Sequence, residues 1–132
     1  MQSDSGDDSV RYLRERLATL GTITTRRMFG AVGVFCDGLM VGILADGGLF
    51  FRVDAGNRAA FERARFGPAL GYTRQGRRIE LAYLRVPDRL IDDPEEFLGW
   101  ARSAYGAAQR VAGKSTPRAP WEKGHGARRR GR

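Results

Sequence analysis

Three short apolar runs, separated by two Asp-Gly pairs, dominate the middle of this 132-residue sequence. The pairs are Asp37-Gly38 and Asp46-Gly47. An Asp-Gly pair between apolar runs is typical of a two-residue hairpin turn, because Asp and Gly tolerate the positive φ angles that such a turn needs. The pattern therefore predicts a three-stranded antiparallel meander over residues 31–36, 39–45 and 49–53.

Apolar residues on both sides of the meander recur at helical spacing. Leu13, Leu17 and Leu20 are separated by steps of four and three. Asp54 is a candidate helix cap, and Asp93 followed by a proline is a typical helix start. We predict helices over 10–20, 55–65 and 94–112.

A second hairpin is expected between the last two helices. Ile79, Leu81 and Tyr83 alternate with polar residues, which indicates a strand with one exposed face. The predicted strands cover 72–74 and 77–85, joined by a Gln75-Gly76 turn. The sequence thus predicts an α+β fold in the order α-β-β-β-α-β-β-α, with helices packed on a five-stranded antiparallel sheet.

Three other segments carry expectations about the core. The β-branched residues 22–25 are expected to add only a short extended lead-in. Met28 and Phe29 are expected to fill the core where the first helix meets the sheet. Leu90 and Ile91 are expected to fold back onto that core.

The net charge of +8 is distributed unevenly along the chain. Residues 1–8 contain three Asp and no base, and we predict a disordered acidic leader there. Residues 9–112 form the single predicted domain. Residues 113–132 contain seven Lys or Arg against one Glu, with one large apolar residue, and predict a disordered basic tail.

Membrane and secretory signals are absent from the pattern. No apolar run approaches the ~20 residues of a membrane span, and the acidic start does not resemble a secretory signal. The single cysteine, Cys36, fits a reducing compartment and is expected to be a small core residue. We therefore expect a cytoplasmic protein without membrane association.

Catalytic groups do not converge in the sequence. The only histidine, His125, lies in the predicted tail. The densest acidic group reads as a helix start, with carboxylates diverging around one turn: Asp92, Asp93, Glu95 and Glu96. We expect no enzyme activity, no catalytic residues, no cofactor and no metal site.

The first candidate site is the segment Arg26-Arg27-Met28-Phe29-Gly30. Paired guanidinium groups beside a glycine-rich backbone suit a phosphate or a partner's carboxylate. In the alternative reading, one arginine bonds helix carbonyls or an internal acid such as Asp54, while the other is solvated. The residues alone leave both interpretations open, and the one in which an arginine bonds groups within the fold is favoured.

The second candidate site is the basic tail, which includes Arg128, Arg129 and Arg130, with Trp121 among its bases. Lys and Arg that neutralise phosphates release counterions, and an indole can stack on a base. The tail therefore suits loose, salt-dependent binding of nucleic acid through residues 113–132. The alternative is a solubilising tail without a target, since Arg-rich composition also follows from genomic base composition.

Several segments in colinear order resemble the N-terminal domain of the TfoX/Sxy family over about residues 9–112. They are Arg26-Arg27-Met28-Phe29-Gly30, Asp37-Gly38, Leu49-Phe50-Phe51-Arg52-Val53, Tyr83-Leu84-Arg85-Val86-Pro87 and Asp92-Asp93-Pro94-Glu95-Glu96. The resemblance implies a secretion-chaperone-like α+β fold and a role similar to that of bacterial competence regulators, which resemble transcriptional co-activators more than enzymes. Those regulators carry a second, C-terminal helical domain, where this sequence has only the basic tail.

Two hypotheses of function follow. The first is a non-enzymatic regulatory module that binds a protein partner, with nucleic-acid affinity from the tail, as a monomer or homodimer. The second is a small-ligand or enzymatic domain with a pocket beside the backbone of residues 30–33. Its candidate pocket residues are Arg26, Arg27, Arg52 and Arg85.

Overall fold

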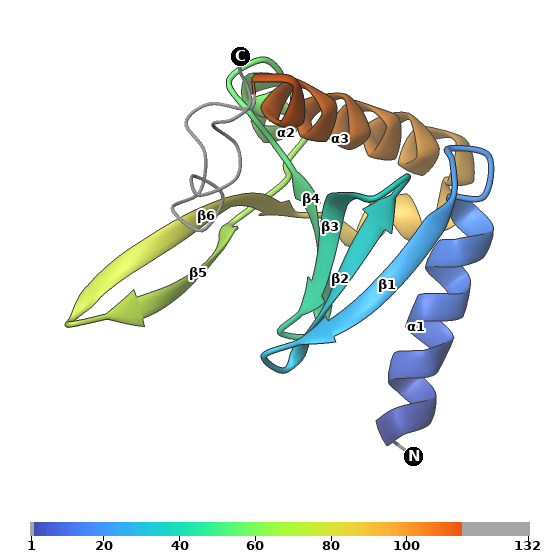
Figure 1. Cartoon of the computed structure of the whole chain (residues 1–132), viewed down its shortest axis with the longest axis horizontal. Coiled ribbons are helices and arrows are strands. Elements are labelled where there is room, and N and C mark those ends of the chain that lie inside the picture. Colours follow the sequence, from blue (N-terminus) through green and yellow to red (C-terminus); the bar gives the residue numbers. More distant parts are fainter. Residues whose placement is uncertain (1, 115–132) are drawn as a thin grey trace, which may run out of the picture.

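Six antiparallel strands form one sheet, and the helices pack on one of its faces (Figure 1). The computed structural model describes residues 2–114. The elements are α1 (Gln2–Arg16), β1 (Ile23–Met28), β2 (Ala31–Cys36), β3 (Leu39–Ala45), β4 (Gly48–Arg52), α2 (Arg58–Arg63), β5 (Ala69–Arg74), β6 (Arg77–Arg85), the 3-10 helix η1 (Asp88–Asp92) and α3 (Pro94–Lys114). The strand order across the sheet is β1-β2-β3-β4-β6-β5.

Four two-residue turns set the register of the strands. In each turn both residues have a positive φ, and the second residue is glycine. This backbone is that of a type I′ turn, whose twist matches the twist of the flanking strands. The four turns are Phe29-Gly30, Asp37-Gly38, Asp46-Gly47 and Gln75-Gly76. The predicted meander and its two Asp-Gly turns are confirmed, with the third strand at Gly48–Arg52.

The core lies between the sheet and the helices, and Phe51 of β4 is at its centre. Its ring lies 5.4 Å from that of Phe97 on α3 and 6.4 Å from that of Phe66, measured between centroids. Phe66 in turn lies 4.5 Å from Phe61 of α2. A register shift between β2 and β3 leaves Val41 without an opposite residue, and Val41 is fully buried in this core.

The sheet has six strands rather than the five predicted, because residues 23–28 form a complete strand. Every residue of β1, from Ile23 to Met28, pairs with a residue of β2. The short β-branched segment was expected to end before the arginines. The strand continues because Arg26 and Arg27 point to opposite faces of an edge strand, where long polar side chains are accommodated easily.

The first helix begins and ends earlier than predicted. It starts at Gln2, so most of the leader that was expected to be disordered is helical, consistent with acidic residues near a helix N-terminus. It ends at Arg16 instead of residue 20. Leu17 is still buried, and the amide of Leu20 donates to the carbonyl of Leu17, so a tight turn continues the apolar spacing.

Other boundaries also differ from the prediction. The second helix is shorter than 55–65, and β5 begins at Ala69 rather than residue 72. The 3-10 helix η1 was not predicted; it buries Leu90, but Ile91 is 54% exposed and does not fold onto the core. The third helix is confirmed and extends to Lys114, so residues 113–114 of the predicted tail are helical.

Two aspartates tie α3 to the loops. Asp54 accepts two hydrogen bonds from Arg110 of α3, at 2.7 and 2.9 Å, and bonds from the amides of Gly56 and Asn57. Asp37 accepts from the amide of Thr22 and from the hydroxyl of Tyr105, both at 2.9 Å. Asp37 and Asp54 therefore also fix the position of the longest helix. The N-cap of α2 is Asn57 and not the predicted Asp54, which instead closes the turn before that helix.

We predict that Phe51→Ala destabilises the fold by about 3–5 kcal/mol, because a large buried ring is replaced by a cavity. The control Val111→Ala removes a side chain that is 41% exposed on α3 and should change stability by less than ~0.5 kcal/mol. Urea denaturation measures both. Equal losses from the two variants would contradict this description of the core.

We also predict that Asp54 contributes to acid sensitivity. The hydrogen bonds from Arg110 lower the pKa of Asp54 from 3.8 to about 2. The folded pKa lies below the unfolded one, so this contribution is complete above about pH 4 and is lost as the pH falls toward about 2. Stability of Asp54→Asn should therefore fall less than that of the wild type over this window.

Urea denaturation at several pH values tests this expectation. The control Asp92→Asn alters an exposed carboxylate that joins no ion pair within the described chain, and its curve should parallel the wild type. If the stability of Asp54→Asn falls with pH as steeply as that of the wild type, the Asp54–Arg110 pair is not responsible for the loss of stability in acid.

Candidate functional site

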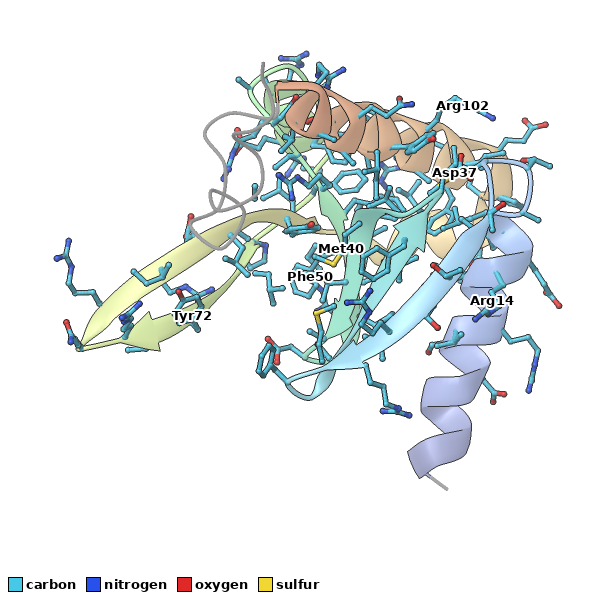
Figure 2. All side chains as sticks on the ribbon, in the orientation of Figure 1. Arg14, Asp37, Met40, Phe50, Tyr72 and Arg102 are labelled. Atoms are coloured by element: carbon cyan, nitrogen blue, oxygen red, sulfur yellow. The ribbon has the colours of Figure 1, made fainter. Side chains whose placement is uncertain are left out.

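The face of the sheet turned away from the helices is the candidate functional site, and we call it the open face. Strand alternation and register place on it a small apolar cluster built only from strand residues: Ile43, Phe50 and Tyr83, with Ala31, Met40, Ala45 and Leu70 around them. Figure 2 shows Met40 and Phe50 on this side and Tyr72 on the projecting β5–β6 hairpin. The open face thus has a core of its own without a helix to cover it.

Three arginines of the open face lie over aromatic rings. The guanidinium carbon of Arg26 is 5.2 Å from the centroid of the Phe35 ring. That of Arg52 is 5.2 Å from the Tyr83 ring, and that of Arg85 is 5.9 Å from the Phe50 ring. Stacking of this kind combines cation–π attraction with coverage of an apolar surface.

Arg52 is the least satisfied of these three arginines. One terminal nitrogen donates to the Tyr83 hydroxyl at 3.0 Å. Its Nε atom is buried and has no hydrogen-bond partner among the described residues, which costs roughly 1–3 kcal/mol.

Acidic residues are missing from the strand positions of the open face. The same alternation adds Arg74 and Arg77, which flank the Gln75-Gly76 turn, and no strand position on this face is Asp or Glu. The ion pairs within the described chain involve other arginines: Arg11, Arg58, Arg89 and Arg110. The open face is therefore positively charged.

Sequence reasoning missed the aromatic half of this arrangement. Phe50 and Arg52 are two residues apart in one strand, as are Tyr83 and Arg85, and residues at that spacing share a face. This signal was present in the sequence. The pairing of β4 with β6, which brings the two segments together, was not readable from it.

The predicted Arg26-Arg27 pair is split by the strand. Arg26 lies on the open face, and Arg27 points to the opposite side of the same edge strand. Met28 lies on the open face, where the missing side chain of Gly33 makes room for it: a Cβ atom on Gly33 would lie 2.7 Å from the Met28 methyl carbon. The segment therefore does not form a paired guanidinium site.

Phe29 was expected to fill the core, and this expectation is wrong. Phe29 occupies the first position of the β1–β2 turn with φ +51° and is fully exposed. Gly30 follows with φ +79°. The aromatic side chain projects from the tip of the hairpin because the turn geometry directs it away from both faces of the sheet.

The alternative interpretation, in which Arg26 or Arg27 bonds an internal acid such as Asp54, is also wrong. Asp54 pairs with Arg110, not with Arg26 or Arg27. Loop carbonyls are bonded by other arginines, such as Arg89, which donates to the carbonyl of Ala64. The predicted tail site, Arg128, Arg129 and Arg130, lies outside the described residues and stays a prediction.

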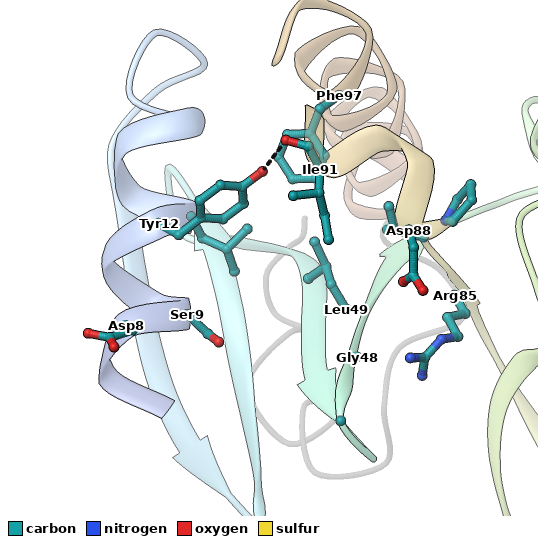
Figure 3. A pocket seen from close by; sticks show the side chains of 13 residues that line it. Asp8, Ser9, Tyr12, Gly48, Leu49, Arg85, Asp88, Ile91 and Phe97 are labelled. Carbon is teal, nitrogen blue, oxygen red and sulfur yellow. Dashed lines mark hydrogen bonds between the residues drawn. The ribbon is translucent and has the colours of Figure 1, made fainter. Parts of the chain in front are cut away.

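A half-open pocket of about 380 Å³ lies between α1, β4 and η1 (Figure 3). Tyr12, Leu49, Ile91 and Phe97 contribute apolar surface, and the Tyr12 hydroxyl donates to the carbonyl of Ile91 at 3.2 Å. Arg85 lines this pocket, but the other arginines of the ligand-binding hypothesis do not. The pocket is also separate from the backbone of residues 30–33.

Two of the potentially reactive side chains, Cys36 and Asp93, occupy structural positions. Cys36 is fully buried, and burial raises the pKa of its thiol, with a smaller contribution from Asp37. Asp93 accepts a hydrogen bond from the amide of Glu96 at 3.1 Å and so caps α3, as predicted. Among the side chains that the structure describes, no group of three or more His, Cys, Asp or Glu residues is arranged to hold a metal ion.

A membrane-spanning helix is likewise not found: over the described residues, no helix combines the length and apolarity that crossing a bilayer requires.

Comparison with known proteins gives one family. The TfoX N-terminal domain family matches residues 15–108, from the end of α1 to most of α3. No curated protein matches this chain. The match covers most of the chain and includes all six strands, and the chain therefore belongs to the TfoX N-terminal domain family.

Proposed function

We propose that this chain is a non-enzymatic regulatory module that acts by binding a protein partner through the Phe29-Gly30 turn and the adjoining open face. Membership of the TfoX N-terminal domain family supports a regulatory role related to competence. The exposed Phe29 carries the proposal, because no contact within the described fold accounts for an aromatic residue at that place. Met28, the preceding residue, joins the turn to the open face.

The four turns of the sheet offer an internal comparison. At the position that needs φ near +50°, three turns have a polar residue: Asp37, Asp46 and Gln75. The fourth has Phe29. An aromatic residue in the left-handed region costs of the order of 1 kcal/mol more than Asp or Asn there, and exposing the ring adds no burial. A residue that is unfavourable for the turn and unused by the core is best explained by a contact with another molecule.

The finer parts of the proposal follow from the family and the charge. We propose that the module acts in the cytoplasm and that the process it regulates is transcription. The basic residues 113–132 would add non-specific attraction to nucleic acid. Catalysis is not part of the proposal, because Cys36 is buried as a thiol and the Asp93–Glu96 turn acts as a helix cap. The protein partner supplies the specificity of the module.

The turn argument predicts that Phe29→Asn stabilises the fold by about 1 kcal/mol, because Asn adopts the left-handed conformation at lower cost. Urea denaturation measures the change. Gln75→Asn is the matched control, since it alters the equivalent position of the β5–β6 turn, and its effect should be smaller. A loss of stability in Phe29→Asn would mean that the ring has a structural role.

The partner is tested by photo-crosslinking in cells of the source organism. A benzophenone amino acid replaces Phe29 in one sample and Arg102, exposed on α3, in the other. We expect a discrete protein adduct from position 29 that is absent from position 102. Identical adducts from both positions, or adducts with nucleic acid only, would contradict the proposal.

A further inference from the structure

We propose that the open face binds an extended segment of a partner protein in which acidic side chains alternate with apolar ones. This inference rests on the proposed function and names the chemistry of its partner. The proposal rests on three observations: three arginines lie over aromatic rings, the strand positions of the same face include no acidic residue, and exposed apolar groups lie beside the arginines.

A guanidinium group that lies over a ring is suited to receive a carboxylate. An arginine that lies over a ring presents its N–H groups at the edge of the plane, where a carboxylate can accept two parallel hydrogen bonds. Arg26 and Arg85 are held in this way over Phe35 and Phe50. The rings restrict the side chains in advance, so little conformational freedom is lost on binding.

Among the described residues, Asp88 is a carboxylate close to one of these arginines, since it lines the same pocket as Arg85 (Figure 3), but the two form no ion pair. The four ion pairs of the described residues use none of them. Residues 115–132 contain one acidic side chain, Glu122, among six Lys or Arg. Charge complementarity therefore points to another molecule, and to an acidic one.

Apolar surface lies between and beyond the arginines. Tyr72 and Leu81 are 46% and 37% exposed, and strand alternation puts both on the open face. Strands lie about 4.8 Å apart, so the four strand steps from Arg26 to Arg85 span roughly 19 Å. An extended segment of about six residues covers that distance and meets both charged and apolar groups.

A protein segment fits this face better than a nucleic acid. Single-stranded nucleic acids are held largely by bases stacked on exposed aromatic rings. Here Phe50 and Tyr83 are buried, and the Phe35 ring lies under Arg26. These three rings are therefore covered, and Tyr72 on the β5–β6 hairpin is the exposed ring of this face among the described residues. The guanidinium edges remain suited to carboxylates.

The test uses the full chain labelled with 15N and a ten-residue peptide of sequence Ser-Glu-Ser-Leu-Ser-Glu-Ser-Leu-Ser-Glu. We expect the arginine Nε–Hε signals of Arg26, Arg52 and Arg85 to shift during titration at about 50 mM salt. Arg26→Gln should weaken binding roughly tenfold. The matched control is Arg27→Gln, the neighbouring arginine on the opposite face, which should change affinity less than about twofold.

Four titration results would overturn the inference. They are equal binding of a peptide with Gln in place of Glu, equal weakening by Arg26→Gln and Arg27→Gln, no shifts up to about 1 mM peptide, and preferential binding of a DNA oligonucleotide at the same arginines. A self-association that Arg26→Gln abolishes would assign the face to a second copy and also overturn it. Circular dichroism confirms that both variants fold.

These failures are distinguishable from failure of the proposed function. A protein adduct at position 29 together with no peptide binding would leave the regulatory module intact and reject only the acidic chemistry. Peptide binding without any adduct at position 29 would support the open face and reject the Phe29 turn as the contact.

Discussion

A sheet with helices on only one face must cover its second face with its own side chains. The helices bury Phe51, Val41 and their neighbours, and no helix of the described chain contributes to the cluster of Ile43, Phe50 and Tyr83. Planar guanidinium groups lying on the rings shield that cluster while their charge stays near solvent. Lysine offers only a point charge on a flexible stem, so it covers a ring less well. The same arginines therefore stabilise the sheet and charge its surface.

Register decides which side each arginine occupies. A one-residue slip between two strands would move Arg52 or Arg85 toward the helices and turn core residues outward. The type I′ turns prevent this slip, and the pairing of Phe51 with Leu84 keeps β4 and β6 aligned. The shift at Val41 is the one local adjustment between β2 and β3, and it adds a side chain to the main core. Turn chemistry thus controls the chemistry of the open face.

The meander, the second hairpin and the third helix could be predicted because each depends on local signals: Asp-Gly turns, period-two alternation and a capping sequence. The strand β1 was missed because two adjacent arginines look unlike a strand until the edge position is known. Hydrophobicity alone predicts a core position for Phe29, whereas the Gly30 that follows it is a signal for the turn in which Phe29 lies. The candidate site was only partly readable, since Arg52 and Arg85 are brought together by the non-local pairing of β4 with β6.

Two departures from local rules lie on the side of the sheet that the helices leave uncovered or at its border, and a third, the positive φ of Arg65, follows α2. Phe29 has an unfavourable backbone conformation and no burial, and Arg52 keeps a buried Nε without a partner among the described residues. Sequences that specify a fold consistently make such exceptions mainly where function requires them. The helical side shows the opposite behaviour: Asp54, Asp37 and Asp93 each accept hydrogen bonds from the groups around them. The polar groups that hold α3 are therefore satisfied within the fold, whereas Phe29 and the Nε atom of Arg52 are not.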